Sequence, residues 1–129
     1  MTIVVGYTPK PEGLAALHAA IGEAQRRKAL LVVLNSSRGG SQTDVNFASP
    51  EDLSRVEDAL RESGIDYELE QKISDKYGAD AILDAAERHN ADLIVIGLRH
   101  RSPTGKFVFG SNAQRVLLEA ENPVLAVKA

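Results

Sequence analysis

A loop rich in glycine and cations, at residues 97–112, contains the residues best suited to chemistry. It leads into a predicted helix, and a helix N-terminus attracts phosphate because its first N–H groups lack partners and carry partial positive charge. Glycine lets the backbone approach a phosphate closely, and cationic side chains add charge-assisted hydrogen bonds. The candidate phosphate-binding residues are Gly97, Arg99, Gly105, Lys106, Gly110, Ser111 and Asn112.

The charge distribution favours a small anionic ligand over nucleic acid. Residues 97–118 contain four basic and no acidic residues, whereas the rest of the chain has 11 basic and 18 acidic ones. Because general polyanion binders are usually basic overall and this chain has a net charge of -3, we expect no nucleic-acid partner. A local basic patch on an acidic body suits a small anion better.

Each candidate also has a purely structural interpretation. Ser111 and Gln114 have the spacing of a capping box, which a helix can use without any ligand. Gly97 and Gly105 can serve only to form turns. The three cations of the loop, Arg99, Arg101 and Lys106, can simply lie on a solvated surface. The residue types alone leave both interpretations open.

The sequence contains no recognisable motif for catalysis or for metal binding. It contains no Walker sequence, no Gly-x-Ser-x-Gly elbow and no His-Glu-x-x-His. The absence of cysteine excludes thiolate sites, and no two histidines lie at metal-ligand spacing. His18 is expected to be partly buried, and His89 to lie at a helix end. We therefore expect no enzyme activity and no metal site; a weak ATPase is a third possibility without an obvious base.

Apolar segments alternate with amphipathic ones along the 129 residues, which predicts one α/β domain over 1–129. The alternation is typical of a doubly wound, mainly parallel sheet with helices on both faces. Ser49 and Pro50 predict a helix start and Gly64 a helix end, and residues 35–48 are expected to form a polar loop. The predicted strands are 3–6, 29–34, 67–71 (an edge strand), 92–97 and 124–127, and the predicted helices are 14–28, 50–63, 78–89 and 113–120.

Neither a membrane span nor a leader is indicated. The longest apolar runs, 29–34 and 93–96, are far shorter than the roughly 20 residues that a span requires. No basic start precedes an apolar segment at the N-terminus. We expect a cytoplasmic protein with no membrane partner.

The same loop and both ends of the chain resemble the universal stress protein family. Nucleotide-binding members carry Gly-x2-Gly-x9-Gly-Ser/Thr before the fourth helix. Gly97, Gly110 and Ser111 match this pattern, while His100 stands at the second glycine. Residues 3–6, 91–97 and 122–127 resemble the first strand, the fourth strand and the ending of the family. The resemblance implies five strands in the order 3-2-1-4-5, an adenine nucleotide alpha hydrolase-like fold.

The resemblance also implies a homodimeric stress-response module that binds ATP or AMP. It places Thr8 and Ser36 beside the adenine, with Thr8 in the position of an acidic residue. The implied dimer interface is the last strand, an apolar edge that needs cover. Because Thr8 and His100 depart from the pattern, the alternative is a dimeric interaction module with a degenerate site. The interface residues are Val124, Leu125, Ala126 and Val127.

Overall fold

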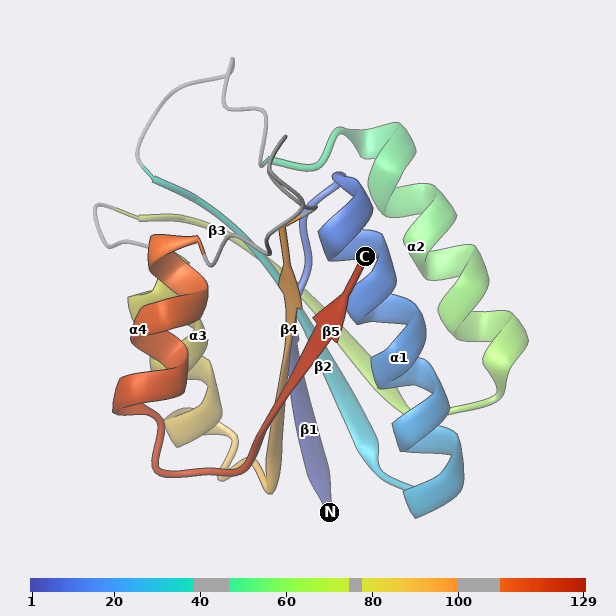
Figure 1. Cartoon of the computed structure of the whole chain (residues 1–129). Helices are drawn as coiled ribbons and strands as arrows, with labels where there is room; N and C mark the ends of the chain where they lie inside the picture. Colours follow the sequence, from blue (N-terminus) through green and yellow to red (C-terminus); the bar gives the residue numbers. More distant parts are fainter. Residues whose placement is uncertain (39–46, 75–77, 100–109) are drawn as a thin grey trace.

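The computed structural model describes residues 1–38, 47–74, 78–99 and 110–129 (Figure 1). Strands and helices alternate in this part of the chain, as the hydrophobic pattern predicts. The strands are β1 (Thr2–Gly6), β2 (Leu30–Arg38), β3 (Tyr67–Ser74), β4 (Leu93–Leu98) and β5 (Val124–Lys128). The helices are α1 (Pro11–Arg27), α2 (Pro50–Ser63), α3 (Gly78–Arg88) and α4 (Ser111–Glu119).

The five strands form one parallel sheet in the order β3-β2-β1-β4-β5, which confirms the implied topology. The chain first builds β1, β2 and β3 toward one edge, then returns to add β4 on the other side of β1. The strand order therefore reverses between β1 and β4. In doubly wound sheets, ligands bind beyond the carboxyl ends of the strands at this reversal.

Two apolar cores fill the space between the sheet and its helices. Figure 1 shows α1 and α2 on one face of the sheet and α3 and α4 on the other. Successive β1 residues alternate between them, since Ile3 and Val5 belong to one core and Val4 to the other. All three have no exposed surface. Burial on both faces explains why the central strands are continuously apolar rather than alternating.

The ends of α2 confirm the local sequence signals. Ser49 accepts a hydrogen bond from the Asp52 backbone, and the Asp52 side chain accepts one from the Ser49 backbone, which makes a capping box. Pro50 occupies the first turn, where its missing N–H costs nothing. Gly64 ends the helix with φ 76°, a left-handed conformation that suits glycine.

Two local expectations are wrong. Residues 35–38, assigned to a polar loop, continue β2, because 71–74 of the edge strand β3 pair with them in register. The polar side chains of 35–38 suggested a loop, but backbone pairing with β3 holds these residues in a strand. His18 is exposed rather than partly buried, because the buried stripe of α1 runs through Ala16, Leu17 and Ala20 and leaves position 18 in solvent.

None of the helices in the described part of the chain combines the length and the hydropathy needed to cross a membrane.

Candidate functional site

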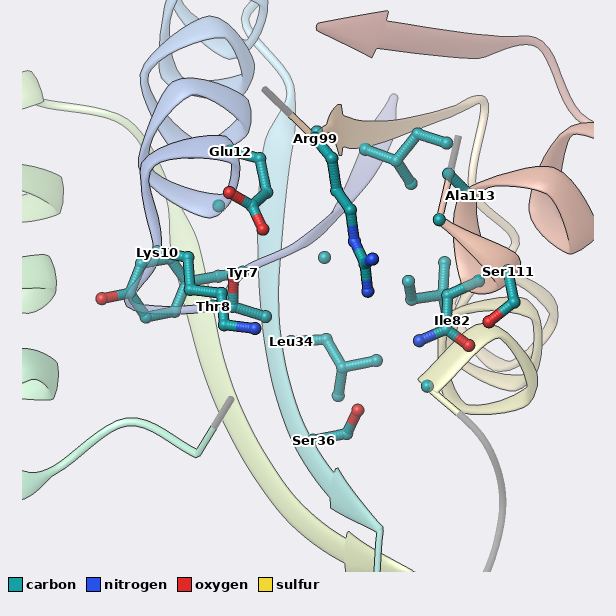
Figure 2. A pocket seen from close by; sticks show the side chains of 17 residues that line it. Tyr7, Thr8, Lys10, Glu12, Leu34, Ser36, Ile82, Arg99, Ser111 and Ala113 are labelled. Carbon is teal, nitrogen blue, oxygen red and sulfur yellow. The ribbon is translucent and has the colours of Figure 1, made fainter. Parts of the chain in front are cut away.

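A pocket of about 350 Å³ lies at the carboxyl ends of β1, β2 and β4, where the strand order reverses (Figure 2). The N-terminal ends of α1, α3 and α4 complete its wall. All the predicted nucleotide-binding residues that the structure describes line this pocket: Thr8, Ser36, Gly97, Arg99, Gly110, Ser111 and Asn112. Gly105 and Lys106 lie outside the described residues.

The inner surface of the pocket is apolar. Leu34 from β2, Ile96 from β4 and Ile82 from α3 contribute to it. Polar groups lie around this surface, with Thr8 after β1 and Ser36 on β2 (Figure 2). An apolar cavity with a few placed polar groups is the usual form of a small-molecule site.

Arg99 points into the pocket from the end of β4 (Figure 2). Within the described residues, no ion pair engages its guanidinium group. The other charged residues that line the described pocket are Lys10 and Glu12. Two cations and one carboxylate leave a positive balance, which favours an anionic group on the ligand.

Close packing against neighbouring backbone leaves no room for a side chain at Gly97 or Gly13. A Cβ on Gly97 would lie 2.0 Å from the carbonyl oxygen of Glu12, so its absence lets the first turn of α1 rest against β4. A Cβ on Gly13 would lie 2.1 Å from the carbonyl oxygen of Thr8. These close approaches shape the pocket wall. They give Gly97 a role that neither the turn nor the phosphate interpretation anticipated, and the sequence analysis missed Gly13.

None of the described residues imposes such a steric requirement on Gly110. It precedes α4 as the N-cap with φ -64° and ψ 155°, a conformation open to any residue. An added Cβ would lie 3.4 Å from Nε of Arg99, close to ordinary contact. The expected capping box is wrong, because α4 begins at Ser111 itself and the cap residue makes no side-chain hydrogen bond. Ser111 therefore lies one position too far into the helix to cap it, and it lines the pocket.

Asn112 joins the N-termini of α3 and α4. Its Oδ1 accepts a hydrogen bond of 3.2 Å from the backbone N–H of Ala79, in the first turn of α3. Arg115 reinforces the junction with bonds of 2.6 and 3.2 Å to Asp80. Hydrogen bonds with Asp80 and Glu119 raise the pKa of Arg115, so it stays charged. Two helix N-termini consequently meet at one side of the pocket, where their partial positive charges add.

The buried side-chain amide of Asn35 supports the side of the pocket that Tyr7 lines. Asn35 has no exposed surface, and its Nδ2 donates to the carbonyl oxygen of Tyr7 at 2.9 Å. Its Oδ1 accepts from the backbone of Ala48 at 2.9 Å and from Nε2 of Gln71 at 3.0 Å. This network joins β1, β2, β3 and the segment that enters α2. The sequence analysis missed it because Asn35 was placed in a loop; a polar residue directly after a fully apolar strand was the available signal.

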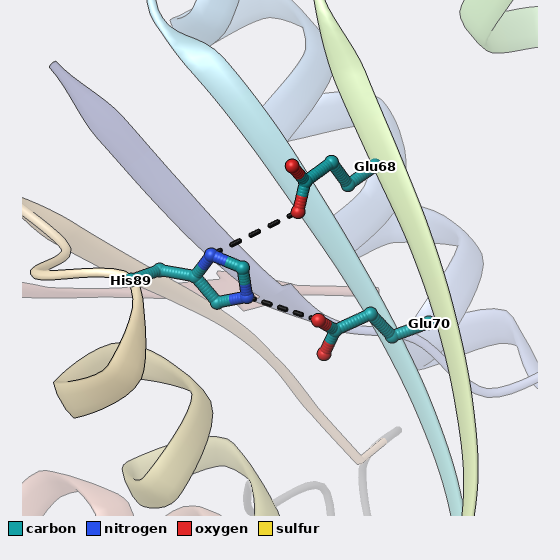
Figure 3. A group of neighbouring side chains, drawn as sticks. All are labelled: Glu68, Glu70 and His89. Carbon is teal, nitrogen blue, oxygen red and sulfur yellow. Dashed lines mark hydrogen bonds and ion pairs between the residues drawn. The ribbon is translucent and has the colours of Figure 1, made fainter.

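A second polar cluster lies away from the pocket. Glu68 and Glu70 of β3 meet His89, which follows α3 (Figure 3). The spacing between histidines along the chain gives no sign of this cluster, because its other two members are carboxylates on β3.

The comparisons with known proteins agree over almost the full length. Residues 1–128 match the model of the universal stress protein family. A universal stress protein of Mycolicibacterium smegmatis is 45% identical over 129 residues, covering 98% of this chain and 96% of that one. The structure of a universal stress protein from Archaeoglobus fulgidus is similar with a TM-score of 0.84 and 35% identity, covering 99% of this chain and 98% of that one.

A further solved structure from Archaeoglobus fulgidus is that of the universal stress protein in complex with dAMP. It is similar with a TM-score of 0.78 and 30% identity, and the match covers 99% of this chain and 98% of that one.

Proposed function

The chain belongs to the universal stress protein family, and on this premise we propose that its pocket binds an adenine nucleotide, ATP or AMP, without turning it over. The observation that carries the proposal is the joint position of Arg99 and two helix N-termini around one pocket with an apolar inner surface. The similar Archaeoglobus fulgidus protein in complex with dAMP supports it. The stress response is the process in which we expect this binding to act.

We expect the phosphate to lie against Ser111 and Arg99. The first N–H groups of α4 are available there, because Gly110 caps the helix without a side chain. Gly105 and Lys106, outside the described residues, remain proposed phosphate contacts. The base then extends over the apolar surface toward Thr8 and Ser36, whose hydroxyl groups can both donate and accept hydrogen bonds.

Calorimetric titration with AMP and ATP tests the proposal. We expect one nucleotide per chain, and Arg99→Ala should weaken binding by about 10-fold or more, because a charge-assisted hydrogen bond contributes roughly 1.5–3 kcal/mol. Arg61→Ala is the matched control, since Arg61 is exposed on α2 and pairs only locally with Asp58. Absence of heat at millimolar nucleotide, or an equal effect of both substitutions, would refute nucleotide binding at this pocket.

The second candidate is a dimeric interaction module that binds no nucleotide. Thr8 favours it, because a hydroxyl group stands where nucleotide-binding members resembling this chain have an acidic residue. We propose that the dimer forms through β5, under either candidate. β5 ends the sheet of the described residues, and an edge strand can pair through its backbone with a second copy of itself. Its side chains at 124–127 are half-buried.

A further inference from the structure

Three side chains from two elements converge on the face of the sheet covered by α3. Glu68 and Glu70 are two residues apart on β3, so their side chains share a face. His89 directly follows α3 and places its ring between the two carboxylates (Figure 3). Its Nε2 lies 3.0 Å from Oε1 of Glu70, and its Nδ1 lies 3.8 Å from Oε2 of Glu68.

The cluster is sheltered on one side and open on the other. The side chains of His89 and Glu70 are 18% and 20% exposed, whereas that of Glu68 is 52% exposed. Arg88 donates to Oε2 of Glu70 at 3.2 Å, so the other oxygen of this carboxylate faces the imidazole. Arg88 thus orients the carboxylate without occupying the atom that faces the cluster.

We propose that Glu68, Glu70 and His89 bind a divalent transition-metal ion such as Zn²⁺, with water completing its coordination. One nitrogen and two carboxylate oxygens form a donor set that zinc accepts, and three protein ligands with an open position are a common arrangement. One ligand atom from each residue lies within 4.8 Å of the others. A tetrahedral zinc ion holds its ligand atoms about 3.3 Å apart, so the proposal requires the three side chains to draw closer around the ion, with one ring nitrogen of His89 as the ligand.

The surrounding contacts fit this role. Ligating carboxylates are normally hydrogen-bonded by a neighbour that fixes their orientation, as Arg88 does for Glu70. An imidazole must lose any second proton before it coordinates a metal, so binding weakens as the pH falls. Because α3 has 11 residues and rises about 1.5 Å per residue, the cluster lies roughly a helix length from the pocket end of α3. The proposed metal site is therefore distinct from the pocket.

Titration of the protein, without any histidine tag, with ZnCl₂ near neutral pH tests the proposal. We expect one zinc ion per chain, and His89→Gln should weaken binding by at least about 10-fold. Glu68→Gln should also weaken it and, at a half-exposed position, should leave the fold intact. Cobalt(II) gives a second readout, since its visible absorption reports a low-coordinate site and should disappear in His89→Gln.

His18→Gln is the matched control, because His18 is exposed on α1 and, within the part of the chain that the structure describes, belongs to no such cluster. It should bind zinc as tightly as the unaltered chain. Unchanged zinc affinity in both His89→Gln and Glu68→Gln, or no binding at millimolar zinc, would overturn the proposal. In either case the three residues form only an ion-pair cluster.

Discussion

The carbonyl oxygen of Glu12 occupies the space that a side chain on Gly97 would need. A Cβ at position 97 would lie 2.0 Å from that oxygen and 2.6 Å from the carbonyl carbon. Both atoms belong to the backbone of the first turn of α1, so they cannot move aside as a flexible side chain would. The pocket between β4 and α1 therefore depends on a glycine that sterics, rather than conformation, requires.

Gly97→Ala should destabilise the protein by about 1–3 kcal/mol, the usual cost of forcing extra volume into a packed contact. Urea unfolding followed by circular dichroism measures the change. Gly110→Ala is the matched control on the other side of the pocket, because among the described residues its Cβ would meet Arg99 alone, at 3.4 Å. Equal losses in the two variants would contradict the steric explanation.

Asn35→Ala should destabilise the protein by about 3 kcal/mol. The substitution leaves the N–H of Ala48 and the carbonyl oxygen of Tyr7 without the amide that they bond now, and each buried unpaired group costs roughly 1–3 kcal/mol. Gln71→Ala removes a partner of the same amide from an exposed position, so its cost should be smaller. The free energies of unfolding of the two variants test this order, and a reversed order would show that Asn35 is not the centre of the network.

Stability should fall in acid partly through Glu70. Burial acts to raise the pKa of this carboxyl group, but hydrogen bonds with Arg88 and His89 outweigh it and hold the pKa below its usual value of 4.5. A lowered pKa in the folded state means that the unfolded chain binds a proton first. The stabilisation from Glu70 is thus complete above the usual pKa and is lost as the pH falls through the lower, folded-state value.

Glu70→Gln should therefore flatten the decline of unfolding free energy in this acid range. The measurement is a series of urea denaturations at decreasing pH. Glu62→Gln, on the exposed face of α2, should retain the slope of the unaltered chain. A slope that Glu70→Gln leaves unchanged would assign the acid sensitivity to other carboxylates.

Val127→Glu should convert the proposed dimer to a monomer. A carboxylate at this half-buried position would bring an unpaired charge into an interface formed by two copies of β5, which is costly. Sedimentation equilibrium measures the change, and circular dichroism checks that the variant folds. Leu118→Glu is the control on α4, since Leu118 is 76% exposed, and it should leave the dimer intact. A monomeric unaltered chain would refute the dimer.

The sequence by itself determined the features that depend on neighbouring residues. The apolar runs of β1 and β4 are buried because no other position can hide so much continuous apolar surface. Ser49, Pro50 and Gly64 mark the ends of α2 because caps act within one turn of the helix. The phosphate-loop residues that the structure describes also lie together, because a strand end and the next helix start are close along the chain.

Only the tertiary structure decided what depends on residues far apart in the chain. The extra length of β2 comes from its pairing with β3, and the need for glycine at position 97 comes from the backbone of Glu12. His89 meets Glu70, 19 positions away in the chain, because α3 packs against β1 and β2 and its C-terminal end then lies beside β3. Such contacts join residues that are distant in the sequence. They form only when the elements pack, so the local pattern of side chains does not predict them.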